Sequence, residues 1–240
     1  MRKPKKNTGD NISAENANWK FSGDVVKKFD SHVKKSVPLY EWSHEIGLKI
    51  SDFFLTEPSL CYDIGCSTGT FLEKIATKNK NKDIKFIGLD EIKDMCEMAK
   101  KKNSKIKKIK ILNKKIQNYN LNKCDFLTSF YTIQFINPSI RQNIFNKIFK
   151  SLRWGGGFLL FEKVRSPDAR FQDMMNQIYM EYKIDQSYTP EEILSKSMSL
   201  KGVLEPFSTN ANIQMMKRAG FKDITTVFKF LNFEGYLAIK

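Results

Sequence analysis

The sequence predicts a single α/β domain whose central sheet is mostly parallel and is closed by a C-terminal antiparallel hairpin. Strand-like and helix-like patterns alternate along residues 59–163, which is typical of a doubly wound parallel sheet. A glycine turn follows the first strand pattern, and the last two strand patterns lie too close together for a parallel crossover. With 240 residues, the chain is long enough to bury a sizeable core.

Two helices are expected before the sheet begins. Residues 24–35 carry apolar side chains at helical spacing, and residues 40–54 follow Pro38, which suits the first turn of a helix. The sheet section then alternates strands at 59–65, 83–90, 108–115, 124–133 and 155–163 with helices at 69–78, 92–103 and 138–152. Three further helices are expected at 168–184, 189–200 and 212–221, and the hairpin at 223–233 and 235–240.

The N-terminal residues 1–18 are basic and polar and lack the apolar segment of a secretory signal. We expect a disordered lead-in there, followed by one domain over 19–240. No run of eighteen apolar residues predicts a membrane-spanning helix. His32 and His44 are interpreted as solvated or satisfied helix residues. The cysteines have neither metal-ligand nor disulfide spacing, which indicates a reducing cytoplasm and no metal site; they are Cys61, Cys66, Cys96 and Cys124.

The formal net charge is +15, and nearly all of the excess is lysine, since only 6 arginines are present. Proteins that bind nucleic-acid phosphates commonly use arginine forks as well as lysines. The densest basic run, at 100–115, covers a loop and a strand, and a compositional bias would produce the same pattern. RNA association therefore stays open as an alternative.

The glycine turn, "YDIGCSTGT" at 62–70, is the expected ligand site, because ligands bind at the carboxyl ends of parallel strands. Gly65 and Gly69 permit a tight turn and close backbone approach, although structural turns use such a pair too. Asp90, at the end of the second strand, can accept both ribose hydroxyls of an adenosine. Ser67 stands where a dinucleotide-binding fingerprint has its second glycine, so adenosine without a diphosphate is the better fit.

A parallel sheet closed by an antiparallel hairpin resembles the class I S-adenosylmethionine (SAM) methyltransferase fold. Asp63 resembles the acid of that fold's "D-x-G" motif, near the amino-acid end of the cofactor. Over residues 19–240 the chain is similar to the carboxy-S-adenosylmethionine (carboxy-SAM) synthase family. The motifs that carry the resemblance are "SVPLY", "YDIGCSTGT", "TIQFINP", "GGGFLLFEK", "AGF" and "NFEGYLAIK", in the family's order and spacing.

The resemblance implies a cytoplasmic homodimer that moves the carboxyl group of prephenate onto the methyl carbon of SAM, in a pathway that modifies the tRNA wobble uridine. The sulfonium makes that carbon acidic enough to form an ylide without a metal. By position in the motifs, the implied cofactor residues are Tyr40, Gly65, Cys66, Ser67, Asp90, Glu91 and Ile116. Tyr40 and Ile116 could equally be ordinary buried residues.

The chain departs from the family pattern around the ligand. In "EEILSKSMSL" the family's carboxylate-binding arginine is replaced by Ser197, while Lys196 is retained. Serine cannot form a bidentate charged pair with a carboxylate, and an unpaired buried carboxylate is costly. Lys115 stands in place of an adenine-side aspartate, and Phe130 in place of an asparagine. Substitutes for the arginine could be Lys163, Arg165 or Arg170.

We therefore interpret the chain as a SAM-dependent transferase, and most simply as a methyltransferase derived from this family. The alternatives are a true carboxy-SAM synthase with a relocated carboxylate partner, and a non-catalytic SAM-binding or RNA-associated protein. A methyl acceptor would be a small molecule or a modified nucleoside. If a catalytic base is used, the candidates are Tyr131, Glu162 and Tyr188, although Glu162 is also explained as a structural ion-pair partner.

Overall fold

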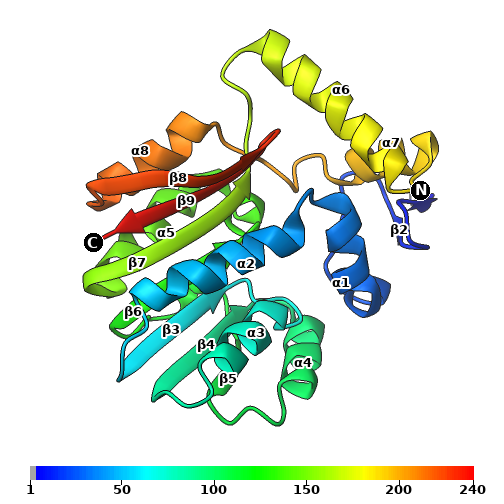
Figure 1. Ribbon diagram of the computed structural model, residues 1–240. Helices are drawn as coiled ribbons and strands as arrows, with labels where there is room; N and C mark the ends of the chain where they lie inside the picture. Colours follow the sequence, from blue (N-terminus) through cyan, green and yellow to red (C-terminus); the bar gives the residue numbers. More distant parts are fainter. Residues whose placement is uncertain (1–3) are drawn as a thin grey trace.

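The computed structural model describes residues 4–240, which form a seven-stranded sheet between two layers of helices (Figure 1). The strand order is β5-β4-β3-β6-β7-β9-β8. The strands are β3 (Ser59–Ile64), β4 (Ile84–Asp90), β5 (Ile109–Asn113), β6 (Cys124–Phe130), β7 (Leu152–Lys163), β8 (Asp223–Phe230) and β9 (Phe233–Ile239).

The sheet has the predicted topology. Strands β3 to β7 pair in parallel, whereas β9 pairs antiparallel with both β7 and β8. Strands β3, β4 and β5 follow one another toward one edge of the sheet, and after β5 the chain returns to place β6 on the other side of β3. The crevice at the carboxyl ends of β3 and β6 therefore lies at a topological switch point, where α/β sheets bind ligands. The predicted closing hairpin and the α/β class are confirmed.

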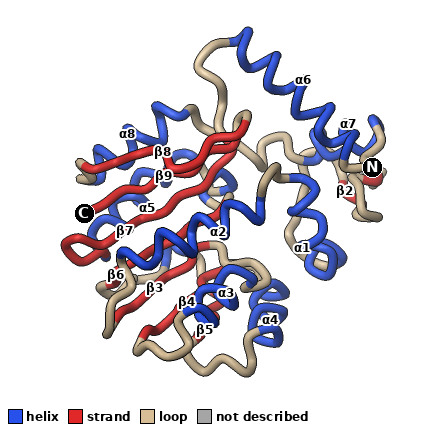
Figure 2. The backbone as a smooth tube through the Cα atoms, viewed as in Figure 1, coloured by secondary structure: helices blue, strands red, loops and turns tan. Residues whose placement is uncertain are grey.

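Helices cover both faces of the sheet, as the tube view shows (Figure 2). One core lies under α2 (Tyr40–Ile50), α3 (Thr70–Lys78) and α4 (Lys93–Lys102). The opposite core lies under α5 (Pro138–Ser151) and α8 (Thr209–Ala219). Successive strand residues divide between the two cores, with Cys61 in the first and Tyr62 in the second, as the two-residue period of a strand requires.

Three helices lie beyond the carboxyl edge of the sheet and border the crevice. They are α1 (Asp24–Ser36), α6 (Ala169–Asp185) and α7 (Pro190–Ser199) (Figure 1). Helix α7 has a full capping box, in which Thr189 accepts from the Glu192 backbone and the Glu192 side chain accepts from Thr189. Every residue of α6 is at least partly exposed, so this helix carries much of its apolar surface outside the core.

The N-terminal segment differs from its expectation. Residues 4–18 form a small hairpin of β1 (Lys6–Asn7) and β2 (Ser13–Ala14) instead of a disordered lead-in. Ile12 is 1% exposed and packs with Trp19 and Val25. The backbone of Ala17 and Trp19 donates to the last carbonyls of α7, which anchors the segment. Residues 1–3 lie outside the described part of the chain.

Two smaller differences concern element ends. Helix α2 begins at Tyr40, after a left-handed Leu39, so Pro38 precedes the helix and does not occupy its first turn. Strand β6 ends at Phe130, earlier than the expected strand over 124–133, and a short 3-10 helix follows at Ile133–Phe135. Within residues 4–240, no helix is long and apolar enough to cross a membrane. All four cysteines are buried free thiols.

Candidate active site

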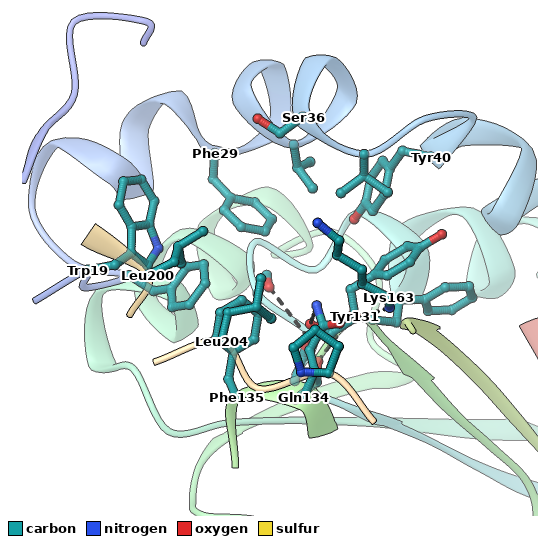
Figure 3. A pocket seen from close by; sticks show the side chains of 18 of the residues that line it. Trp19, Phe29, Ser36, Tyr40, Tyr131, Gln134, Phe135, Lys163, Leu200 and Leu204 are labelled. Carbon is teal, nitrogen blue, oxygen red and sulfur yellow. Dashed lines mark hydrogen bonds between the residues drawn. The ribbon is translucent and has the colours of Figure 1, made fainter. Parts of the chain in front are cut away.

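A cavity of about 820 Å³ lies at the carboxyl ends of β3, β4, β6 and β7. Its walls come from the glycine turn, the loops after β5 and β6, and helices α1, α2, α6 and α7. Figure 3 shows aromatic side chains on both sides of the cavity and Lys163 between them. The volume suits a drug-sized ligand.

The glycine turn has the tight backbone that the sequence predicts. The backbone N–H groups of Gly65 and Cys66 both donate to the carbonyl of Leu89. Gly65 has φ 71°, and a Cβ at this position would collide with the side chain of Thr132. Gly65, Cys66 and Ser67 therefore line the cavity with close backbone approach.

Gly69 has a different role from the one expected. It has φ 75° and occupies the N-cap of α3, where its carbonyl accepts from the side chain of Asn103. It does not line the cavity. Its small size allows α3 and α4 to pack closely, because a Cβ there would meet Asn103 and Ala99.

Asp90 is a buried carboxylate at the cavity with free acceptor positions. It is 8% exposed and lines the cavity at the end of β4. One carboxylate oxygen accepts from the Ser67 N–H at 2.9 Å and the other from the Ile92 N–H at 2.8 Å. A carboxylate oxygen has two lone pairs, so each can accept one further hydrogen bond. Burial raises the pKa of Asp90, while these two bonds favour its ionised form.

Asp63 is a buried carboxyl group that has no cationic partner in residues 4–240. It is 3% exposed, lies on the cavity wall, and accepts a hydrogen bond from Thr128 at 2.8 Å. Burial raises its pKa to about 7, although the Thr128 bond opposes the shift and Asp90 adds repulsion. A ligand ammonium next to Asp63 would compensate the buried charge. The α-amino group of SAM has that chemistry.

The loop after β5 carries one of the sequence departures, Lys115. Lys115 forms an exposed ion pair with Glu91 at 3.4 Å, so the lysine is explained by a neighbour of opposite charge. Ile116 is 5% exposed and presents an apolar surface to the cavity. Lys147 holds this loop by donating to the backbone carbonyls of Ile116, Gln117 and Tyr119.

Aromatic rings form the wall next to the glycine turn. Tyr40 lies 6.0 Å from Tyr131 and 4.6 Å from His44 between ring centroids. Phe130, the second departure from the family pattern, packs on His44 at 4.8 Å and on Phe71 at 4.6 Å. His44 is 2% exposed and burial lowers its pKa to about 3, so it is a neutral member of this aromatic cluster.

The opposite wall is basic. The amines of Lys163 and Lys183 lie 4.3 Å and 4.5 Å from the ring centroid of Tyr179. Burial lowers the pKa of Lys163 to about 7, with Lys183 and Arg165 adding repulsion, and lowers that of Lys183 to about 8. Within residues 4–240, neither amine has a carboxylate within ion-pairing distance.

The end of β7 holds Lys163 in place. The backbone N–H of Lys163 donates to the side-chain oxygen of Gln134 at 2.8 Å. Arg141 in turn donates to the carbonyls of Gln134 and Ile136. The "TIQFINP" segment therefore fixes the loop that borders the basic wall.

Ser197 and Lys196 both line the cavity, on α7. Of the three suggested substitutes for the arginine, Lys163 projects into the cavity (Figure 3). Arg165 also lines the cavity. Arg165 also donates to the carbonyl of Pro206 at 3.1 Å. Arg170 does not line the cavity.

The three candidate bases differ in whether they line the cavity. Tyr131 lines the cavity with a buried hydroxyl, whereas Glu162 and Tyr188 do not line it. Glu162 is 3% exposed and accepts from the Ile133 N–H at 3.0 Å. Burial raises its pKa to about 8, while Arg141 opposes the shift. Within residues 4–240 Glu162 has no ion-pair partner, so the expected structural ion pair is wrong, and the carboxyl group instead holds the backbone of the loop after β6.

Four residues of the site have no sequence motif of their own: Trp19, His32, Tyr179 and Lys183, all on the cavity wall. The basic run at 100–115 also has structural roles. Lys102 pairs with Asp30 at 2.6 Å, and Lys108 donates to the carbonyl of Asn79 at the end of α3. Some of the excess lysines therefore stabilise the fold through ion pairs and hydrogen bonds.

Solved structures with the same architecture are SAM-dependent methyltransferases. A SAM-dependent methyltransferase from Aquifex aeolicus matches with TM-score 0.61 and 16% identity, covering 92% of this chain and 99% of that one. A putative SAM-dependent methyltransferase from Methanococcus maripaludis matches with TM-score 0.61 and 19% identity, covering 93% and 95%. A family profile described as a methyltransferase domain matches residues 62–156. The chain has a class I SAM methyltransferase fold.

Curated relatives define the family more narrowly. Carboxy-S-adenosyl-L-methionine synthase of Staphylococcus epidermidis is 37% identical over 223 residues, covering 92% of this chain and 97% of the relative. The protein of that name from Campylobacter lari is 35% identical over 223 residues, covering 92% and 94%. The chain belongs to the carboxy-SAM synthase family and is a SAM-dependent transferase.

Proposed function

We propose that this protein is a carboxy-SAM synthase that transfers a carboxyl group from a small carboxylic acid, such as prephenate, to the methyl carbon of SAM. The observation that carries the proposal is the basic wall of the cavity. Lys163 and Lys183 place two amines opposite the cofactor turn, and neither has a carboxylate partner in the described part of the chain. The family arginine is missing from the same cavity, at Ser197. An anionic group is the occupant that this wall favours.

The cofactor half of the cavity fits SAM without a further assumption. Asp90 would accept from the ribose, Asp63 would pair with the α-amino group, and Ile116 would contact the adenine. The sulfonium, when bound, supplies the acidity of the methyl carbon. The rings of Tyr40, Phe130 and Tyr131 pack together in the wall of the cofactor half of the cavity and keep water away from it.

Lys163 is the residue that we assign to the carboxylate of carboxy-SAM. Its amine lies inside the cavity and its backbone is fixed by Gln134. A carboxylate partner would raise its lowered pKa and replace the lost hydration of the ammonium. A charge-assisted hydrogen bond of this kind contributes about 1.5–3 kcal/mol.

Ser197 supports a second candidate, a SAM-dependent methyltransferase with a different acceptor. Serine leaves the α7 side of the cavity without the family's cation, and methyl transfer requires chiefly an aligned nucleophile. In that case the basic wall would bind an anionic acceptor. The two functions differ in their product, so a product analysis separates them.

The proposal is tested with SAM and prephenate and with protein produced in a host that lacks its own carboxy-SAM synthase. Mass spectrometry should detect carboxy-SAM, and Lys163→Met should lose affinity for carboxy-SAM by about 10- to 100-fold while SAM affinity stays within about twofold. Lys217→Met, an exposed lysine on α8, is the matched control. Equal carboxy-SAM affinity in Lys163→Met and the control would contradict the assignment.

We also propose that the protein is a homodimer joined through α6. Five large apolar side chains of this helix are exposed: Phe171, Met174, Ile178, Met180 and Ile184. Met180 and Ile184 also border the cavity, so a second copy of the chain would complete its wall. Light scattering should show a dimer that Ile178→Lys dissociates, and a monomeric unaltered protein would contradict this proposal.

A cytoplasmic location and a role in tRNA wobble-uridine modification follow from the proposed activity. Carboxy-SAM is a group donor, so an enzyme that consumes it must act in the same compartment. Deletion of the gene should remove the carboxyl-derived modification from tRNA, measured by nucleoside mass spectrometry. An unchanged modification pattern would contradict this role.

A further inference from the structure

The cavity has an aromatic compartment on the side away from Tyr40 and Tyr131. In Figure 3, Trp19, Phe29 and Phe135 gather there with Leu200 and Leu204. Phe21 links the rings, with centroids 5.9 Å from Trp19, 6.4 Å from Phe29 and 4.9 Å from Phe135. These side chains come from the N-terminal segment, α1, the loop after β6 and the end of α7. The compartment therefore suits an apolar ring.

Polar groups close one end of this aromatic compartment. The indole Nε1 of Trp19 is buried and has no hydrogen-bond partner within the described residues. The amine of Lys196 lies over the same indole and 3.2 Å from Nε2 of His32. A buried donor without a partner is uncommon, so an acceptor from a ligand is the expected complement.

The N-terminal hairpin holds His32 in one tautomer. Asp10, at the tip of the hairpin, lies 2.7 Å from His32 Nδ1 and also accepts from Lys35 at 2.8 Å and Tyr188 at 2.7 Å. Burial opposes ionisation of Asp10, but these hydrogen bonds outweigh it and lower its pKa to about 2. An ionised carboxylate only accepts, so the Nδ1 atom of His32 carries the proton.

This tautomer leaves Nε2 of His32 as an acceptor on the cavity side. Burial lowers the pKa of His32 to about 4, so the ring is neutral at physiological pH and its Nε2 accepts from Lys196. Asp10 and His32 thus hold the Lys196 amine over the ring of Trp19. Asp10, His32 and Lys196 come from three different parts of the fold, and hydrogen bonds between them fix the position of the amine.

The amine of Lys196 has no acidic partner within the described residues. Within residues 4–240, no carboxylate lies at ion-pairing distance from its amine. The charged groups that face it are Lys183, which repels it, and Asp10, which attracts it from behind His32; burial is the larger influence and lowers the pKa of Lys196. A ligand carboxylate would therefore bring a proton to the amine when it binds.

We propose that Lys196, aimed by Asp10 and His32 and accompanied by the free indole N–H of Trp19, binds a carboxylate of the carboxyl donor, whose ring occupies the aromatic compartment. This inference rests on the proposed function, because it assigns the second substrate of the same cavity. It makes Lys196 a specificity residue and Asp10 a positioning residue. The N-terminal segment then forms part of the substrate site.

The test uses prephenate as the probe and isothermal titration in buffers of different ionisation enthalpy. Binding to the unaltered protein at pH 8 should take up protons. Lys196→Met should weaken prephenate binding by about 10- to 100-fold and reduce the proton uptake, with SAM affinity within about twofold. Lys217→Met is again the control.

Asp10→Asn tests the positioning role through a pH profile. Loss of the Asp10 charge should lower the pH above which prephenate binding declines, because the carboxylate supports the ammonium form of Lys196. Asp10→Glu should restore part of the profile. Thermal unfolding of each variant identifies any general loss of structure.

The outcomes distinguish the two proposals. Carboxy-SAM formation with prephenate affinity unchanged in Lys196→Met would overturn the subsite and leave the proposed function standing. Prephenate binding that depends on Lys196, without any carboxy-SAM formed, would overturn the function and support the subsite. No prephenate binding to the unaltered protein would overturn both.

Discussion

Replacing Asp63 by asparagine should stabilise the ligand-free protein at neutral pH and weaken the binding of SAM. The folded-state pKa of Asp63 is about 7, against 3.8 for an ordinary aspartate. Because the folded carboxyl retains a proton that the unfolded chain has released, this group favours folding at low pH. That contribution is lost as the pH rises from about 4 to about 7.

The magnitude follows from the shift. A rise of about three pKa units, at 1.36 kcal/mol for each, corresponds to about 4 kcal/mol above pH 7. The asparagine amide adds a buried donor that costs about 1–3 kcal/mol. The net gain in the free energy of unfolding at pH 8 is therefore about 1–3 kcal/mol, and the gain should be smaller by about 3 kcal/mol at pH 4.5.

Urea unfolding of both proteins at pH 8 and pH 4.5 measures this difference, and other titrating groups such as Glu162 cancel in the comparison. Titration with SAM at pH 8 should show an affinity lower by about 10- to 100-fold in Asp63→Asn. A stability difference that does not change with pH would refute the reasoning about burial. An unchanged SAM affinity would refute the assignment of Asp63 to the ligand ammonium.

Three further changes test other parts of the site. Gly65→Ala should abolish SAM binding measured by calorimetry, since the left-handed backbone and Thr132 leave no room for a methyl group; binding within tenfold of normal would contradict this view of the turn. Glu162→Gln should keep steady-state turnover within about threefold, because glutamine can still accept from the loop backbone; a hundredfold loss of kcat with normal binding would restore Glu162 as a base. Ser197→Arg in the Lys163→Met background should recover affinity for carboxy-SAM over SAM by about tenfold, and a titration without recovery would show that position 197 does not face the carboxylate.

The fold could be predicted because each of its elements has a local signature. The alternation of strand and helix patterns, the glycine turn and the short final connection predict a mostly parallel sheet with a closing antiparallel hairpin. The N-terminal segment could not be predicted in this way. Its order depends on Ile12 and Trp19 packing against distant residues and on backbone bonds to the end of α7, none of which leaves a periodic pattern.

The cofactor half of the site was also accessible from sequence, because Gly65, Asp63 and Asp90 occupy strand ends in a recognisable motif. The basic wall was not, apart from Lys163. Lys183 and Tyr179 lie on a solvent-facing helix, and their proximity to Lys163 depends on how α6 crosses the edge of the sheet. The pairing of Asp10 with His32 likewise joins residues whose contact only the tertiary structure shows.

The most direct test of the account is the product formed from SAM and prephenate by the purified, ligand-free protein. Mass spectrometry should show carboxy-SAM accumulating with time, and Lys163→Met should reduce its yield. SAM left unconsumed, or converted only to its demethylated product when an acceptor is supplied, would contradict the carboxyl-transfer function and favour a methyltransferase.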